Sequence, residues 1–150
     1  MSLRKYEVSV DAVALAAATA KSIFELATSA NNQAKIRSWW VEFDGVTASN
    51  TPVKVEVGRF SAAVTTATAV TPSKLDGAGV ASLSTAKHST STEGAGTFDA
   101  GETHRIPPTS GMYVQYPDGD ELVVGVSGFF RIRCTAAQAV NATFGCAWYE

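Results

Sequence analysis

The chain has 150 residues, of which 45% are hydrophobic and 17% are charged, and its formal net charge is −2. This length fits a single domain, residues 1–150, with a core that needs no metal or disulfide framework. The weak net charge, without a basic stripe, argues against nucleic-acid binding. No apolar run approaches the length of about 20 residues that a membrane-spanning helix needs. The charged start lacks the apolar region of a signal peptide, which predicts synthesis in a cytoplasm.

Alternation of apolar and polar residues is the dominant pattern, and it begins near the N-terminus. A period of two places successive side chains on opposite faces of a β-strand, so residues 3–11 predict a first strand. The alanine-rich segment 12–20 is interpreted as a loop or a loose strand. Because alanine favours helices and Asp11 can cap one, a short helix is the alternative. Further strands are predicted at 21–27 and 35–43, with an asparagine-containing turn between them.

The middle of the chain holds one clear strand and a long polar stretch. In residues 52–60 valines alternate with polar residues, which predicts a strand, and another is predicted at 80–86. Residues 87–109 are small and polar without periodicity, and they predict a long loop. Loops of this length are uncommon in compact domains and are usually functional, so a neighbouring subunit is expected to order this one.

The last third returns to strong alternation. Strands are predicted at 112–116, 122–126, 129–135 and 142–149, and residues 117–120 predict a turn because Pro and Asp-Gly occupy favoured turn positions. This makes about eight or nine strands at a spacing of about ten residues, without helical segments between them. The pattern predicts an all-β, antiparallel sandwich or barrel rather than parallel βαβ units.

Strand parity separates the expected core from the expected surface. Phe130, Ile132 and Cys134 share one face, which is predicted to point inward, while Arg131 and Arg133 are predicted to point outward. Four strand glutamates fall mostly at solvent-facing parity and are interpreted as surface charge that prevents wrong strand pairing: Glu7, Glu25, Glu42 and Glu56. The two cysteines, Cys134 and Cys146, are predicted to be buried free thiols that act as small hydrophobic residues.

Two adjacent tryptophans are the most conspicuous candidates for contact. Trp39 and Trp40 cannot face the same way in a regular strand, so one enters the core and the other lies outside, or a bulge breaks the parity. An outward-facing indole is a candidate contact residue. Exposed aromatic residues could also form a sugar-binding platform, although core and edge packing is the more common role; the candidates are Trp39 or Trp40, Tyr113, Trp148 and Tyr149.

The residues show no constellation typical of a catalytic or metal site. His88 and His104 lie in or beside the predicted loop, and neither has a ligand-type spacing to another histidine. They are interpreted as solvated loop histidines, or as interface histidines that pair with a neighbour's carboxylate. Residues 118–121 lack the spacing of a calcium loop and are interpreted as a turn. Without a nucleophile elbow or a phosphate-binding loop, the chain is not expected to be an enzyme or to bind a cofactor.

A set of short segments spread over nearly the full length carries a diffuse family resemblance: 6–10 (YEVSV), 22–26 (SIFEL), 34–45 (AKIRSWWVEFDG), the valine strand from Pro52, 70–76 (VTPSKLD) and 117–124 (PDGDELVV). Through these segments the chain resembles a family of head decoration, or cement, proteins of tailed bacteriophages, which have a jelly-roll-like β-fold.

This resemblance implies a single jelly-roll-like sandwich with a non-enzymatic role. The chain would be a virion structural protein, a homotrimer seated on the capsid surface, with the major capsid protein as its partner. The expected contact residues are Trp39, Trp40, His88, His104 and Arg105. The alternative is a stand-alone carbohydrate-binding or receptor-binding module. A third hypothesis, a hydrolase, requires His88 or His104 within hydrogen-bond reach of a nucleophile.

Overall fold

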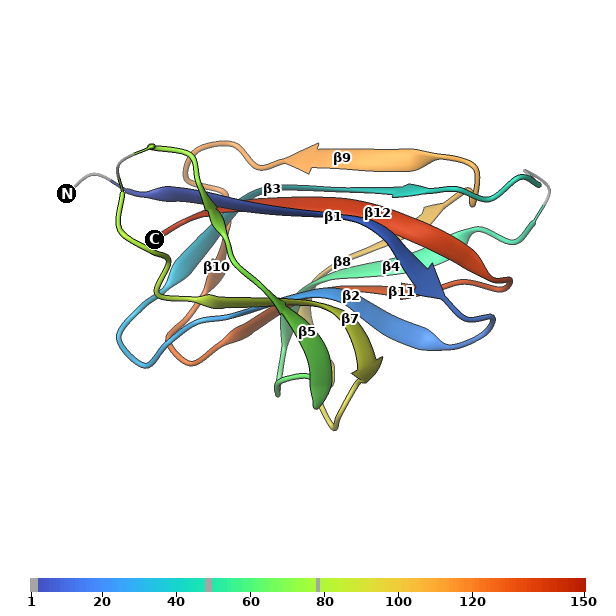
Figure 1. Ribbon diagram of the computed structural model, residues 1–150, viewed down its shortest axis with the longest axis horizontal. Coiled ribbons are helices and arrows are strands. Elements are labelled where there is room, and N and C mark those ends of the chain that lie inside the picture. Colours follow the sequence, from blue (N-terminus) through green and yellow to red (C-terminus); the bar gives the residue numbers. More distant parts are fainter. Residues whose placement is uncertain (1–2, 48–49, 78) are drawn as a thin grey trace.

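A computed structural model describes residues 3–47, 50–77 and 79–150, and in these residues it shows strands and no helix (Figure 1). The strands are β1 (Lys5–Leu15), β2 (Ala20–Ala27), β3 (Ala34–Phe43), β4 (Val53–Phe60), β5 (Thr66–Val70), β6 (Ser73–Lys74), β7 (Thr85–Thr92), β8 (Phe98–Ile106), β9 (Gly111–Gln115), β10 (Leu122–Val124), β11 (Phe129–Thr135) and β12 (Val140–Tyr149). Across these ranges, no helix has the length and apolarity to cross a bilayer.

The strands form two antiparallel sheets. Eight of them pair as in one long antiparallel hairpin, here called the ribbon, that is folded over so that its strand pairs are divided between the two sheets. Sheet A has the order β10-β3-β12-β1-β6, with β9 also paired to β3, and sheet B has the order β5-β7-β2-β11-β4-β8. The outermost pair of the ribbon is β1 with β12, followed by β2 with β11, β3 with β9 and β4 with β8. Successive pairs alternate between the sheets, which is the arrangement of a jelly roll. The predicted all-β, jelly-roll-like sandwich is therefore confirmed.

The described residues contain more strands than the eight or nine expected. The ribbon accounts for eight strands, while β5, β6 and β7 lie between β4 and β8, and β10 lies between β9 and β11. The extra strands are short or polar: β6 has 2 residues and β10 has 3. Such elements give almost no periodic signal in a sequence, because periodicity needs several buried positions.

The core lies between the two sheets and is centred on aromatic rings. The ring of Phe24 on β2 lies 5.4 Å from that of Phe144 on β12, 6.3 Å from Phe130 on β11 and 6.4 Å from Trp148 on β12. All four side chains are fully buried. Rings at such separations gain energy from edge-to-face and tilted contacts beyond the area that they bury, so this group joins sheet B to sheet A.

The alanine-rich segment 12–20 contains no helix. Strand β1 continues through it to Leu15, with a register shift between Val10 and Val13 where Ala12 adopts a positive φ of 52°. Beyond the shift, Val13 and Leu15 are both 2% exposed and pair with β12. Burial of these two side chains outweighs the intrinsic helix preference of alanine, which is worth only tenths of a kcal/mol per residue.

The predictions for residues 80–109 are largely wrong. Residues 80–84 lie outside any strand, and β7 begins only at Thr85. The expected loop 87–109 instead contains most of β7 and all of β8, joined by a turn. Strand β8 forms the edge of sheet B and alternates between half-buried and exposed positions. Glu102 and His104 occupy half-buried positions there between the apolar Ala100 and Ile106, so polar residues interrupt the apolar alternation that would have indicated a strand.

Other predicted features agree with the structure. Cys134 and Cys146 are free and buried, and burial raises the pKa of both thiols. The turn at 117–120 is present: the backbone N–H of Gly119 donates to Glu121 Oε2 at 2.8 Å, and Asp118 forms an ion pair with Arg37.

The two ends of the described chain meet at one end of the sandwich, here called the terminal end (Figure 1). Arg4 and Glu150 exchange backbone hydrogen bonds. The Glu150 carboxylate also holds the segment that precedes β7, because it accepts hydrogen bonds from Ser82 Oγ at 2.6 Å and from the backbone N–H of Leu83 at 2.8 Å. Burial raises the pKa of this carboxyl, but the hydrogen bonds from Ser82, Leu83 and Trp148 outweigh it, so the pKa lies below its ordinary value.

This network predicts a pH-dependent cost for Glu150→Gln. A folded-state pKa below the unfolded value means that the ionised carboxylate stabilises the fold above about pH 4.3, and that this stabilisation is lost as the pH falls through the folded pKa. The free energy of unfolding, measured by urea denaturation, should therefore be lower for Glu150→Gln at neutral pH, and the difference from the parent should shrink toward about pH 3. Glu7→Gln, on an exposed position of β1, is the matched control; an equal loss in both variants at every pH would contradict the prediction.

Candidate functional site

The outward face of sheet A carries the most exposed aromatic surface of the described residues. Cross-strand register places Tyr113 of β9 beside Trp40 of β3, Gly145 of β12 on the other side of Trp40, and Ser9 of β1 beyond Gly145. Residues in one such row point to the same side of a sheet. The row therefore forms an aromatic strip, Tyr113 and Trp40, continued by small residues.

The tryptophan pair divides as alternation requires. Trp39 is fully buried in the core, while Trp40 is half-buried on the outward face. A Cβ atom at Gly145 would overlap the indole of Trp40, so only glycine lets the ring lie against β12 at this point. Gly145 is itself buried although it faces outward. Of the other residues considered for a sugar-binding platform, Trp148 is fully buried and Tyr113 is 61% exposed.

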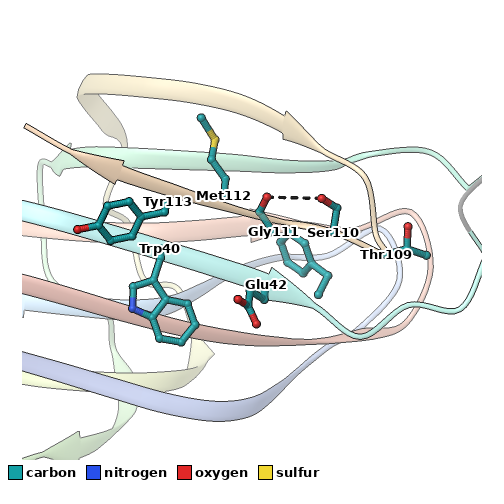
Figure 2. A pocket seen from close by; sticks show the side chains of 8 residues that line it. Trp40, Glu42, Thr109, Ser110, Gly111, Met112 and Tyr113 are labelled. Carbon is teal, nitrogen blue, oxygen red and sulfur yellow. Dashed lines mark hydrogen bonds between the residues drawn. The ribbon is translucent and has the colours of Figure 1, made fainter.

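Two hollows flank the Trp40 indole. The larger, of about 720 Å³, is lined by Trp40, Glu42, Ser110 and Tyr113 together with their neighbours (Figure 2). The second, of about 360 Å³, shares Trp40 and Tyr113 and is completed by a set of mainly polar residues: Lys5, Glu7, Val8, Ser9, Ser38, Cys146 and Ala147. Each hollow therefore combines an aromatic wall with a carboxylate and hydroxyl groups.

Trp39 and His104 belong to a hydrogen-bonded chain at the edge of the sandwich. Trp39 Nε1 donates to Tyr116 Oη at 3.2 Å, and Tyr116 Oη donates to Glu102 Oε1 at 2.6 Å. Glu102 Oε2 lies 2.8 Å from His104 Nε2, and the His104 ring lies 5.6 Å from that of Trp39. Burial and the hydrogen bond to Glu102 raise the pKa of the Tyr116 phenol. His104 therefore helps to join β8 of sheet B to β3 of sheet A and is not a solvated loop histidine.

Two further expected contact residues, His88 and Arg105, lie outside this series of hydrogen bonds. His88 is half-buried on β7, where its Nδ1 lies 2.8 Å from Ser89 Oγ, and burial lowers its pKa. Arg105 is exposed on β8 beside Lys54. The His88–Ser89 contact and the His104–Glu102 contact are not connected by any hydrogen bond among the described residues. They therefore do not assemble a serine, a histidine and a carboxylate into one relay.

A buried charged cluster on sheet B shows that the interpretation of Glu25 and Glu56 as surface charge is wrong. Arg131 points away from the inter-sheet core, as expected, but its side chain is fully buried, and so is Glu25 opposite it on β2. Arg131 Nε donates to Glu25 Oε2 at 3.1 Å, and a second carboxylate, Glu93, lies 3.4 Å from Arg131 Nη1. Glu56 is also buried and pairs with Arg133 at 2.9 Å. These residues are internal ion pairs and not surface charge.

The cover over this cluster comes from two turns that sequence parity could not place. The backbone N–H of Val64 donates to Glu25 Oε2 at 2.7 Å, and Arg131 donates to the carbonyl oxygen of Ala62. A Cβ at Gly96 would overlap both Arg131 and Ala62, so the turn between β7 and β8 also lies against the guanidinium. The signal in the sequence was the presence of opposite charges at matching parity on three strands, but only the strand register shows that they face one another.

In residues 3–47, 50–77 and 79–150, no group of three or more His, Cys, Asp or Glu side chains is arranged to hold a metal ion. In comparisons with known proteins, no family model matches this chain, and neither does any curated protein or solved structure.

The buried cluster predicts a large loss of stability for Arg131→Ala. Removing one partner of a buried pair leaves the other charge uncompensated, which costs about 3–5 kcal/mol. The free energy of unfolding from urea denaturation should fall by this amount. Arg105→Ala, at an exposed position of the neighbouring sheet edge, is the control and should stay within about 0.5 kcal/mol of the parent. Similar losses in both variants would show that the cluster contributes no more than surface charge.

Proposed function

We propose that this chain is a non-enzymatic structural protein of a bacteriophage virion. It decorates the capsid surface as a homotrimer, and it stabilises the shell by packing against copies of itself and against the major capsid protein. The proposal is supported by the family resemblance of the sequence and by the jelly-roll fold, which occurs in viral capsid and lectin domains. Because one fold hosts many functions, the surface has to supply the stronger argument.

The observation that carries the proposal is the apolar character of the terminal end. Large hydrophobic side chains are exposed at eight described positions, and six of these lie at that end: Leu3, Leu75, Val80, Leu83, Val123 and Val126. Hydrogen bonds place three of them there, since the Leu75 N–H donates to the Lys5 carbonyl, the Leu83 N–H to Glu150, and the Tyr6 hydroxyl to the Val80 carbonyl. Leu3 precedes Arg4, which bonds to Glu150, and Val123, three residues before Val126, pairs with Lys35, which in turn pairs with Tyr149. Exposed apolar residues gathered in one region mark interaction surfaces.

The overall chemistry of the surface fits assembly better than catalysis. Only 17% of the residues are charged, against about 25% in typical domains, so less charge has to be desolvated when two copies meet. Burial at about 25 cal/mol per Å² favours association before its entropic costs are subtracted. A specific subunit interface should bury more than about 1,000 Å², which an apolar end of this kind can contribute to.

The proposal is tested by oligomeric state and capsid binding. The protein should give a light-scattering mass of three times the 15.7 kDa of the chain, and it should bind purified capsids of the phage or prophage whose genome encodes it. Replacing Leu75 and Leu83 by Asp should reduce both the trimer fraction and capsid binding at least about tenfold, because two charges would have to be buried in the interface.

The chain offers a matched control for this test. Val46 is 96% exposed and follows β3, whose last residue, Phe43, pairs with Ala142 near the start of β12, whereas Leu83 bonds to Glu150 beyond the end of β12. Val46→Asp should leave the mass and capsid binding unchanged. A parent protein that stays monomeric at high concentration and does not bind the capsids would refute the proposal, and so would a gene neighbourhood without capsid or portal genes.

A further inference from the structure

The aromatic strip on sheet A has a construction that assembly at the terminal end does not explain. Trp40 stands half-buried on an outward face, and Gly145 leaves the space that its indole occupies. Tyr113 lies beside it, more than half exposed, with its hydroxyl donating to Gln115 Oε1 at 3.0 Å. The two rings are therefore held in place by the sheet and by a hydrogen bond, while part of their surface remains in contact with water.

Polar groups surround the two rings on both sides. Figure 2 shows the Glu42 carboxylate next to the Trp40 indole, with Ser110 and Thr109 further along the same hollow. On the other side of Trp40 the second hollow offers Glu7, Ser9 and Ser38. Carboxylates accept hydrogen bonds, and hydroxyl groups donate and accept them. The rings thus form an apolar floor with hydrogen-bonding groups along both margins.

This arrangement restricts the chemistry of a ligand. Trp40 lies on β3, which is paired on both sides, and Tyr113 lies on β9, whose outer edge is unpaired. A peptide that added to β9 by backbone pairing would extend the sheet beside the strip and would not lie over the two rings. Two glutamates and one lysine line the hollows, so the local charge disfavours an anionic ligand. A matching ligand has a flat C–H face for the rings and hydroxyl groups for the carboxylates.

We propose that the Trp40–Tyr113 strip is a binding site for a neutral glycan built of pyranose rings. The axial C–H groups of a pyranose would stack on the indole, whose face carries negative charge density, and ring hydroxyls would donate to Glu42 on one side and Glu7 on the other. Hollows of about 720 and 360 Å³ are both within the range of small-ligand sites. Trp40 and Tyr113 supply the stacking, and Glu42 supplies the principal acceptor.

The residues that carry this site differ from those that carry the proposed assembly. Trp40, Tyr113 and Glu42 lie on the outward face of sheet A, whereas the exposed apolar residues lie at the terminal end, which the second hollow meets only at Lys5, whose carbonyl accepts the Leu75 N–H. A variant that loses assembly, with Leu75 and Leu83 replaced by Asp, should still bind the glycan. A variant that loses the glycan should still assemble on capsids, so the two proposals can fail independently.

The test uses the full chain with defined glycans. The probes are tetrasaccharides of β-1,4-linked glucose, β-1,4-linked N-acetylglucosamine and β-1,4-linked mannose, titrated by calorimetry, with insoluble cellulose, chitin and bacterial peptidoglycan in pull-down assays. At least one probe should bind with a Kd of about 1 mM or tighter. Binding should also change the intrinsic tryptophan fluorescence, and because Trp39 and Trp148 are fully buried, this change would come from Trp40.

Three variants with a control decide which residues act. Trp40→Ala should weaken binding at least about tenfold through loss of the stacking surface, and Glu42→Gln should weaken it several-fold while the stacking remains. Gly145→Val keeps the indole but displaces it, and should weaken binding as strongly as Trp40→Ala. Arg59→Ala, exposed on β4 of sheet B, should bind as the parent does.

The outcomes that would overturn the proposal are distinct. Absence of binding to every probe would overturn it, as would equal binding by the parent and by Trp40→Ala. A Trp40→Ala protein that shifts from oligomer to monomer in light scattering, with no glycan bound by the parent, would instead identify the strip as an interface between copies. If Trp40→Ala fails to fold, as judged by circular dichroism, Tyr113→Ala and Glu42→Gln decide the question, because both residues are outside the core.

Discussion

Burial of one face of each sheet against the other is the constraint on which the rest of this structure depends. A strand points alternate side chains to opposite faces, so every residue that enters the core between β2, β11 and β12 leaves its neighbours facing outward. The rings of Phe24, Phe130 and Phe144 and the indole of Trp148 occupy the centre of that core. Each sheet therefore has a second, outward face whose side chains do not contribute to the core between the sheets.

The outward faces of the two sheets differ in whether other segments of the chain cover them. On sheet B the outward face is covered around Arg131 and Glu25: turns before β5 and after β7 lie over these two residues, and backbone groups of both turns bond to the ion pair. Burying these charges is tolerable only because each is paired and hydrogen-bonded. On sheet A the outward face stays open, and Gly145 leaves space for the Trp40 indole. The outward face of sheet B therefore contains a buried charged cluster, whereas that of sheet A exposes Tyr113 and part of Trp40.

These differences separate the surface into regions with different physical roles. The terminal end gathers exposed aliphatic side chains, which favour association with a protein surface because they lack directional bonding. The strip on sheet A combines rings with carboxylates and hydroxyl groups, which suits a small polar ligand with an apolar face. The chain of hydrogen bonds from Trp39 through Tyr116 and Glu102 to His104 has neither character, and it connects the two sheets at their edge.

The sequence by itself determined the fold class, most strand positions, the inward face of β11 and the burial of both cysteines. It also indicated that Trp39 and Trp40 face opposite ways in a regular strand, and the tertiary structure decided which of them enters the core. The features that the sequence determined all follow from local alternation, because burial of one face imposes a period of two. Strand β8, the continuation of β1 through an alanine-rich segment, and the burial of Arg131, Glu25 and Glu56 were decided only by the tertiary structure. Their state depends on which strand lies opposite and which turn folds over them, and contacts between residues distant in sequence leave no periodic trace in the chain.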